Sequence, residues 1–398
     1  MDRIAARIRD FPTTVFSEFS ALAHAHQAVN LGQGFPDFDG PEEIREAAAR
    51  AIRDGMNQYA VSSGAVALKE AIAAHALRFY GQRVDPVSEV VVTSGATEAL
   101  FDVTLSFVDP GDEVILFEPY YDSYVANVTM AGGIPRYVLL RPPDAEHPRW
   151  WYDRAELEAE FSEKTKFLLL NTPHNPTGKV FDREELAHIA SLCIRHDVLA
   201  FTDEVYEHIT FEPARHLRLA TFPDMAERTL TISSGGKAFS VTGWKIGWII
   251  GAPALCAAAQ KTHQFVTFAT ATPLQQAIAT ALVLPDSFYA DLTSFYRKKR
   301  DFLVDTLAEA GLRPIAPEGS YFAMARIDHL GFPDDFEFCR WLTRDVGVAA
   351  IPPTAFYAEH HRRHGQQLAR FAFCKRDETL HAARERLARL ASRRTQPR

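Results

Sequence analysis

The sequence predicts an α/β protein with a large unit, in which a mostly parallel sheet lies between helices, and a smaller α+β unit. From Glu89 onward, short apolar runs alternate with helical segments. Each run is apolar throughout rather than at every second residue, which indicates strands covered on both faces. After Pro285 the pattern becomes helical and then mixed. A chain of 398 residues is also long for a single core, which favours more than one folding unit.

The elements can be placed in order along the chain. Pro41, followed by two glutamates, indicates the start of a helix. A second helix is expected over residues 65–79, with Leu68, Ile72 and Leu77 facing inward. Strands of the large sheet are expected at residues 90–93, 114–117, 167–170, 198–202, 229–232 and 248–250. Strands of the smaller unit are expected at residues 321–325, 348–351 and 370–374.

These elements predict how the chain is divided. Residues 1–41 form an N-terminal segment that joins the smaller unit, and residues 42–285 form the large unit. Residues 286–391 supply a connecting helix and the small C-terminal unit, and residues 392–398 form a tail. The smaller unit is therefore expected to be built from both ends of the chain.

Composition narrows the class of protein. A formal net charge of −8 and a pI near 6 argue against a nucleic-acid partner, which would select for a basic face. The four cysteines are far apart, without the spacing of a zinc or redox motif. The charged start lacks the apolar core of a signal peptide, and no apolar run is long enough to span a membrane. We expect a cytoplasmic protein without a membrane partner.

Polar and small residues collect where the predicted strands end, which is where ligands bind in open α/β sheets. The first strand is followed by S-G-A-T-E-A-L, a turn opening a helix whose free N–H groups suit a phosphate. A turn of this kind, or an Asn-Pro pair, is ordinary loop chemistry when it occurs alone. Five such features at one sheet edge indicate a binding site. They are Gly95, Ala96 and Thr97, then Tyr121, then Asn175, then Asp203 with Tyr206, then Lys237 with Lys245.

Together these residue types match the needs of pyridoxal phosphate. Its aldehyde condenses with a lysine amine, and Lys237 lies among small residues that leave it accessible. Its phosphate needs a helix start and a cation such as Lys245. A carboxylate, here Asp203, keeps the pyridine nitrogen protonated, and that charge makes the cofactor an electron sink. The other needs are met by Tyr206 and Asn175 for the ring oxygen, Tyr121 for the ring face, and Arg370 for an amino-acid carboxylate.

Longer motifs extend this pattern over nearly the whole chain. They include L-G-Q-G-F-P-D-F at 31–38, N-Q-Y at 57–59, G-A-T-E-A-L at 95–100, N-T-P-H-N-P-T-G at 171–178, D-E-V-Y-E-H at 203–208, T-G-W-K-I-G at 242–247 and G-V-A-A-I-P at 347–352. With them the sequence resembles the fold-type I, pyridoxal-phosphate-dependent aminotransferases of class I/II, in the branch of kynurenine, glutamine–phenylpyruvate and methionine aminotransferases. It is most similar to the bacterial methionine aminotransferases, which share S-A-L-A, F-P-D-F-D-G-P and Y-D-S-Y.

The resemblance implies a fold with a large cofactor-binding domain and a role for each site residue. Lys237, Asp203 and Tyr206 would be catalytic, in a transfer that proceeds through Schiff base and quinonoid intermediates. Ala96, Thr97, Ser234 and Lys245 would bind the phosphate, and Gly34, Asn175 and Arg370 would bind the substrate. Tyr59 is similar to a tyrosine that family members lend to the neighbouring subunit's phosphate. The resemblance therefore implies a homodimer with shared active sites.

The same resemblance points to a substrate class. The positions that match the family's side-chain pocket are Phe16, Phe268 and Phe356, with Tyr59 nearby, and no arginine stands among them. An aromatic slot favours apolar side chains and suits a thioether. We therefore expect an amino group to pass from methionine or an aromatic amino acid, with kynurenine, glutamine and histidine as further donors, to a 2-oxo acid.

Other interpretations use the same residues. A cysteine-conjugate β-lyase or an aspartate-type aminotransferase would need the same lysine and aspartate. Lys245 and Tyr121, however, stand where aspartate aminotransferases carry an arginine and a tryptophan. A cofactor-binding transcription regulator would require a basic DNA-binding domain, for which the residues before Leu31 are too few. A cluster of His360, His361 and His364 lies among arginines, and we expect no metal there.

Overall fold

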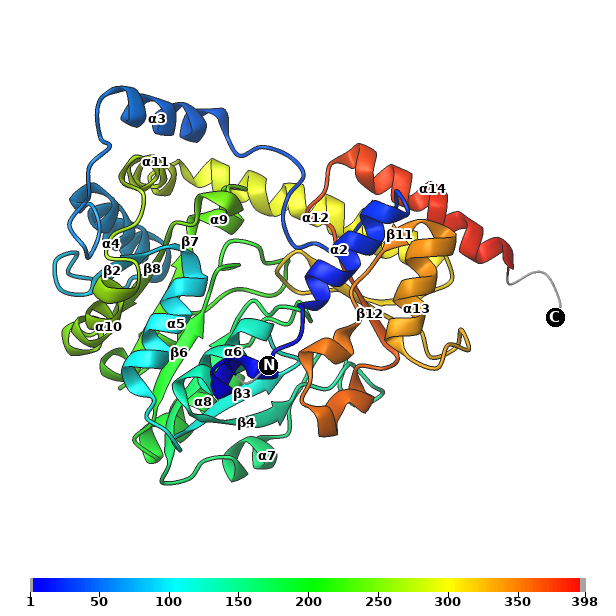
Figure 1. The fold of residues 1–398 in the computed structure, drawn as a ribbon, viewed down its shortest axis with the longest axis horizontal. Coiled ribbons are helices and arrows are strands. Elements are labelled where there is room, and N and C mark those ends of the chain that lie inside the picture. Colours follow the sequence, from blue (N-terminus) through cyan, green and yellow to red (C-terminus); the bar gives the residue numbers. More distant parts are fainter. Residues whose placement is uncertain (1–2, 394–398) are drawn as a thin grey trace.

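The structure is a computed structural model that describes residues 3–393 (Figure 1). Its largest sheet has seven strands in the order β2-β8-β7-β6-β5-β3-β4. Strand β8 runs antiparallel to both of its neighbours, and the other pairs are parallel, so the predicted mostly parallel sheet is confirmed. The strands are β2 (Val90–Thr93), β3 (Glu113–Glu118), β4 (Ile134–Leu139), β5 (Thr165–Asn171), β6 (Leu199–Asp203), β7 (Thr229–Ser234) and β8 (Gly247–Gly251).

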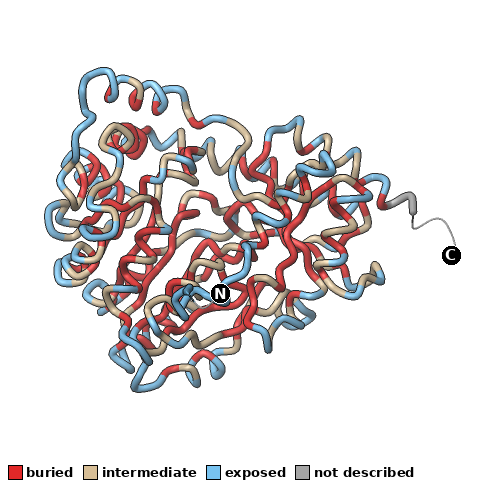
Figure 2. The backbone as a smooth tube through the Cα atoms, viewed as in Figure 1, coloured by how far each residue is buried: buried red, intermediate tan, exposed pale blue. Residues whose placement is uncertain are grey.

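Helices cover both faces of this sheet, as the continuously apolar strands predicted. Alternate residues of β5 belong to two separate cores: Leu168 packs in the core that contains α8, and Phe167 packs in the core that contains α5 and α10. Figure 2 shows the central strands buried throughout. The helices around the sheet are α3 (Glu42–Arg53), α4 (Val66–Tyr80), α5 (Gly95–Phe107), α6 (Asp122–Ala131), α7 (Arg154–Ala159), α8 (Arg183–Arg195), α9 (Gly235–Ala238), α10 (Pro253–Val266) and α11 (Thr272–Leu282).

Two details of the large sheet differ from the sequence prediction. Strand β4 was not predicted, because it is an edge strand with only one partner and its first residue, Ile134, is exposed. The prediction that Leu77 faces inward was wrong, since its side chain is half exposed. Leu68 and Ile72 on the same helix are buried as expected.

A second set of elements lies beside this sheet at the right of Figure 1. A three-stranded antiparallel sheet has the order β12-β10-β9, and a two-stranded parallel sheet pairs β1 with β11. The strands are β1 (Val29–Asn30), β9 (Arg313–Ile315), β10 (Phe322–Arg326), β11 (Val348–Ala349) and β12 (Leu368–Ala372). The helices are α2 (Val15–Ala25), α12 (Asp286–Glu309), α13 (Asp335–Trp341) and α14 (Asp377–Arg393). Helix α1 (Ala6–Arg9) lies apart from them, against α6 of the large unit.

Residues from both ends of the chain share one hydrophobic core in this second set. Phe19 of α2 belongs to the same buried cluster as Leu303 of α12 and Leu387 of α14. The pairing of β1 with β11 also joins the N-terminal segment to the C-terminal part. The domain boundaries after residues 41, 285 and 391 stay a prediction. Within residues 3–393, no helix has both the length and the apolar character needed to cross a membrane.

Candidate active site

A cavity of about 230 Å³ opens where the central strands of the large sheet end and the second set of elements begins. Strand β6 contributes Asp203, the turn after β7 contributes Lys237, and β12 contributes Arg370 from the far side. Most residues predicted from the sequence are thus brought together. The predicted residues that line the cavity are Phe16, Gly34, Gly95, Ala96, Thr97, Tyr121, Asn175, Asp203, Tyr206, Ser234, Lys237, Lys245 and Arg370.

Asp203 is the buried anion of the cavity. It is the last residue of β6, and one of its carboxylate oxygens accepts a hydrogen bond of 2.7 Å from the hydroxyl of Tyr124. The other oxygen accepts from the backbone N–H of Val205 at 3.3 Å. Burial raises the pKa of Asp203, and the two hydrogen bonds oppose that rise. A cationic ring nitrogen beside this carboxylate would relieve the cost of burying its charge.

Lys237 lies in the short helix α9, on a turn that only small residues can form. A side chain at Gly235 would come within 2.7 Å of Ile278 on α11, and one at Gly236 would meet the backbone of Thr242 at 3.1 Å. Burial lowers the pKa of Lys237, which makes its neutral, nucleophilic form more accessible. Its Nζ is 5.7 Å from the ring centre of Tyr206.

The start of α5 forms the end of the cavity that is suited to bind a phosphate. Lys245 donates a hydrogen bond of 3.2 Å from Nζ to the Oγ1 of Thr97, so a cation stands beside the free N–H groups of this helix start. Gly95 has φ +75°, and a side chain there would contact Lys245 at 3.2 Å. Gly247 is equally constrained, because its Cβ would lie 2.5 Å from the backbone of Gly95.

Arg370 is almost fully buried and supplies the cation on the opposite side. It donates to the side-chain oxygen of Asn175 at 3.1 Å and to the backbone oxygen of Gly32 at 2.7 Å. Its Nε has no hydrogen-bond partner within the described part of the chain. Burial lowers the pKa of Arg370 to about 10, so the guanidinium remains charged at neutral pH. A buried, incompletely paired guanidinium is suited to bind a carboxylate.

The aromatic residues predicted for the side-chain pocket divide into two groups. Phe16 lines the cavity, and the ring of Phe356 packs behind it at 5.7 Å without reaching the cavity. Phe268 and Tyr59 lie outside the cavity of a single chain. Their rings contact each other at 5.2 Å on the surface, where Phe268 is 48% and Tyr59 81% exposed. Phe268 follows the end of α10 and has a left-handed backbone conformation, with φ +70°. Its ring lies on the surface and not on the cavity wall where it was expected.

Two residues that support the site were not predicted from the sequence. Tyr124 lines the cavity and holds Asp203, and Asn171 accepts the backbone N–H of Asn175 at 2.7 Å. The motif Y-D-S-Y placed Tyr121 and Tyr124 on the same side of a helix start, which is a signal for the first of these. Asn171 ends strand β5 directly before the predicted Asn-Pro turn, so its position was a signal too.

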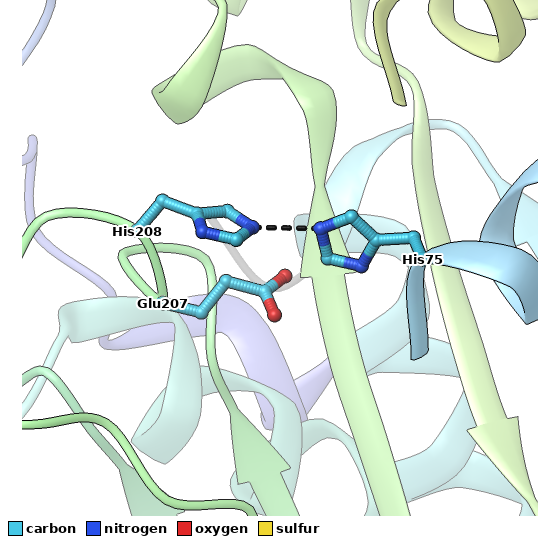
Figure 3. A group of neighbouring side chains, drawn as sticks. All are labelled: His75, Glu207 and His208. Carbon is cyan, nitrogen blue, oxygen red and sulfur yellow. Dashed lines mark hydrogen bonds between the residues drawn. The ribbon is translucent and has the colours of Figure 1, made fainter. Parts of the chain in front are cut away.

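A buried polar cluster behind the lysine turn was also missed. Figure 3 shows His75 and His208 facing each other, with the Glu207 carboxylate beside them. The two imidazoles share a hydrogen bond of 2.7 Å, and burial lowers their pKa values to about 4 and about 3. Glu207 accepts hydrogen bonds from Arg218 at 2.8 Å and from Ser233 at 2.6 Å. The cluster thereby fixes Ser233, which precedes the cavity residue Ser234.

The donor set of the cavity fits pyridoxal phosphate. It offers a buried carboxylate for a ring nitrogen, an amine of lowered pKa for an aldehyde, and a helix start with a cation for a phosphate. The fold and the site together define a pyridoxal-phosphate-dependent enzyme that acts on amino acids.

Comparison with known proteins assigns the family. The chain belongs to the family described as Aminotransferase class I and II, whose sequence model matches residues 26–387. It is 42% identical to the methionine aminotransferase of Escherichia coli over 97% of this chain and 98% of the relative. It is 40% identical to a kynurenine–oxoglutarate transaminase of Dictyostelium discoideum, over 96% and 94%. The solved N-succinyldiaminopimelate aminotransferase of Mycobacterium tuberculosis is 45% identical and superimposes with a TM-score of 0.93, over 97% of this chain and 100% of the other.

The protein is therefore an aminotransferase that uses pyridoxal phosphate. The predicted family, fold class, cofactor and reaction type are confirmed. The predicted residue roles, amino donor and homodimer stay predictions.

Proposed function

We propose that the protein transfers an amino group from methionine or an aromatic L-amino acid to a 2-oxo acid, with kynurenine, glutamine and histidine as further donors. The observation that carries the proposal is the surroundings of Arg370. Phe16 and Phe322 line the cavity beside it, and Arg370 is the only arginine on the cavity wall within residues 3–393. A distal carboxylate inside this cavity would therefore lack a guanidinium partner, whereas an apolar side chain would gain contact with aromatic rings.

The roles of the charged residues follow from their positions. Pyridoxal phosphate, when bound, supplies the electron sink for bond changes at the Cα of the amino acid. Lys237 would hold the aldehyde carbon through Nζ until the amino acid displaces it, and its freed amine would then move the Cα proton, which its lowered pKa supports. Asp203 would hold the ring nitrogen proton, and Tyr206 and Asn175 would donate to the ring oxygen. Tyr121 would pack on the ring, and the phosphate would be bound by Gly95, Ala96, Thr97, Ser234 and Lys245.

The substrate carboxylate is held by Arg370 with Asn175 and Gly34. Gly34 is required because a side chain there would lie 2.5 Å from the ring of Phe322, which packs 4.2 Å from the Arg370 guanidinium. The close packing of Gly34 against Phe322 therefore fixes the Phe322 ring and, through it, the Arg370 guanidinium. Orientation of the substrate by this contact places its Cα near Lys237.

The active form is a homodimer with shared active sites. Tyr59, Val61 and Phe265 are 81%, 66% and 86% exposed, and Phe268 packs against Tyr59 in the same region. Large apolar side chains gathered on a surface are typical of a protein–protein interface. In a twofold dimer this surface would meet its own copy, and Tyr59 would reach the phosphate of the partner subunit.

A second candidate donor is an N-succinylated diamino dicarboxylate. The solved relative named for that substrate is 45% identical to this chain. An outer cavity of about 960 Å³ shares Phe16 and Tyr121 with the inner one, and Arg362 lines its wall. A long donor could extend past Phe16 into this space and place a distal carboxylate near Arg362.

A donor panel tests the proposal. Methionine, phenylalanine, kynurenine, aspartate and N-succinyldiaminopimelate are compared by kcat/KM with one 2-oxo acid. We expect methionine and phenylalanine to exceed aspartate, and a preference for aspartate or for the succinylated donor would overturn the assignment. A parallel assay of pyruvate release from a cysteine conjugate, without an acceptor, measures β-lyase activity with the same enzyme.

A further inference from the structure

Helices α5 and α10 share a buried group of charges that no step of the reaction uses. Glu98 and Asp102 stand one turn apart on α5, and His263 faces them from α10. The Nδ1 of His263 lies 2.9 Å from an oxygen of Glu98 and 3.7 Å from an oxygen of Asp102. Neither oxygen of Asp102 has a hydrogen-bond partner within the described residues, although this side chain is fully buried.

The hydrogen bonds of His263 define its protonation state. Its Nε2 is 2.9 Å from the backbone oxygen of Ser62, which can only accept, so Nε2 carries a hydrogen. Its Nδ1 faces an ionised carboxylate, which also can only accept, so Nδ1 carries a hydrogen as well. His263 is therefore an imidazolium between two carboxylates. Burial alone would lower the pKa of His263, but Glu98 and Asp102 outweigh it and raise that pKa to about 9.

Each end of this charged group reaches a functional segment. The second oxygen of Glu98 accepts the backbone N–H of Ser94, the residue that precedes the phosphate-binding turn of Gly95, Ala96 and Thr97. Ser62 belongs to the loop that carries Tyr59, in residues 57–64. The backbone oxygen of His263 also accepts the N–H of Phe268, whose ring packs on Tyr59.

We propose that His263 is a positioning residue that joins the Tyr59 loop to the phosphate-binding turn, so that subunit contact and cofactor affinity are coupled through one buried side chain. The inference deepens the proposed function, because it rests on the roles given there to Tyr59 and to the start of α5. The positive charge of His263 matters because a neutral imidazole has only one N–H and cannot donate to both Ser62 and Glu98. His263 would therefore affect the affinity for the cofactor and would not contact the reacting atoms.

The test compares two variants of the holoenzyme. His263→Gln removes the charge and one of the two donor nitrogens. Glu98→Gln breaks the same hydrogen bond from the other side and serves as the test if His263→Gln folds poorly. Gln260→Ala is the matched control, because Gln260 donates to the Oγ of the same Ser62 at 2.8 Å, and its side chain makes no hydrogen bond to α5 within residues 3–393. Amide hydrogen exchange is followed by mass spectrometry in residues 57–64 and 94–97, together with the dissociation constant of pyridoxal phosphate.

We expect His263→Gln and Glu98→Gln to speed exchange in both segments and to weaken cofactor binding about ten- to hundredfold, the loss of one charged hydrogen bond. At saturating cofactor, kcat should stay within about threefold of the wild-type value, since the reacting groups are unchanged. Gln260→Ala should speed exchange in residues 57–64 alone.

Two results from the variants would overturn the proposal. One is a His263→Gln variant whose residues 94–97 exchange as in the wild type, with unchanged cofactor affinity. The other is a stoichiometric metal ion in the purified holoenzyme that the Asp102→Asn variant loses, because a divalent cation would then occupy the place of the proton. An incorrect donor assignment would show itself separately, in the wild-type donor panel. A monomeric wild type would refute the proposed dimer and, with it, the coupling of subunit contact to cofactor affinity.

Discussion

The hydroxyl of Tyr124 donates a hydrogen bond of 2.7 Å to the carboxylate of Asp203, and both side chains are buried at the base of the cavity. Burial favours the neutral form of a carboxyl group, whereas a donated hydrogen bond favours the ionised form. The two effects oppose each other at Asp203, whose pKa is raised by burial and lowered by Tyr124. Tyr124 therefore helps to keep a charge where a protonated ring nitrogen would need one.

The Asp203→Asn variant should lose about 10²- to 10³-fold or more in kcat, the typical cost of removing one strong electrostatic contact at a reacting centre. Cofactor should still bind, because the phosphate contacts are unchanged. Steady-state kinetics and cofactor absorbance measure the two effects. Tyr124→Phe is the milder comparison variant. It keeps the carboxylate of Asp203 and removes one hydrogen bond to it, so its kcat should fall by only about tenfold. A Asp203→Asn enzyme within a few-fold of wild type would contradict the role.

The Lys237→Ala variant should fold normally, yet lose transamination and the absorption band of cofactor bound covalently to a lysine. Lys245, the other lysine on the cavity wall, hydrogen-bonds Thr97 at the phosphate end and cannot substitute for it. Absorbance spectra and single-turnover assays check the outcome. Lys298→Ala, at an exposed position on α12, is the control that should behave as the wild type. Near-normal turnover by Lys237→Ala would exclude the assignment.

The sequence predicted well those elements that are determined by residues close together in the chain. Strand β2 covers residues 90–93 as predicted, because a continuous run of buried valines has few alternatives. The parallel order of β5, β6 and β7 then carried Asp203 and Lys237 to one edge, which strand position alone could anticipate. Edge strand β4 was missed because one side of it has no partner, so its apolar signal is weak.

The site was harder to predict where it depends on contacts between distant segments. The bond between Tyr124 and Asp203 joins residues 79 positions apart. The group of Glu98, Asp102 and His263 likewise becomes visible only once α5 packs on α10. Phe356 was expected on the cavity wall, but the packing of Phe16 in front of it could not be deduced from residue types. Tyr59 and Phe268 would join a site only in the proposed dimer, so their place in the single chain does not test their predicted roles.

The Arg370→Lys variant should raise KM for every amino donor by about 100-fold while lowering kcat much less. Lysine keeps the charge but cannot hold Asn175 and Gly32 together and still present a planar pair of donors to a carboxylate. Initial rates over a wide range of donor concentration separate KM from kcat. Wild-type KM values in Arg370→Lys would show that the substrate carboxylate binds elsewhere.

Shared active sites predict that two inactive variants restore activity when mixed. Tyr59→Ala damages the partner's site, and Lys237→Ala damages its own, so a heterodimer retains one intact site with both residues. Subunit exchange under mild denaturant, followed by assay, should recover up to about a quarter of wild-type activity, since half of the dimers are mixed and each has one of two sites. Mixtures that form heterodimers by mass spectrometry but stay inactive would count against the dimer proposal.

The Phe16→Ala variant should lower kcat/KM for methionine and phenylalanine about tenfold and leave alanine as a donor within about threefold. Phe16 lines the inner cavity 5.1 Å from the Arg370 guanidinium, so its ring bounds the space a donor side chain would fill. Removing roughly 50 Å² of apolar contact costs about 1.3 kcal/mol at 25 cal/mol per Å², or about tenfold. Alanine is the internal control because its methyl group cannot reach the ring, while it uses the same carboxylate contact and the same lysine. Equal losses for all three donors would mean that Phe16 acts by supporting Arg370 rather than by contacting the side chain. A gain for aspartate would reveal a distal cation behind the ring and reverse the proposed preference.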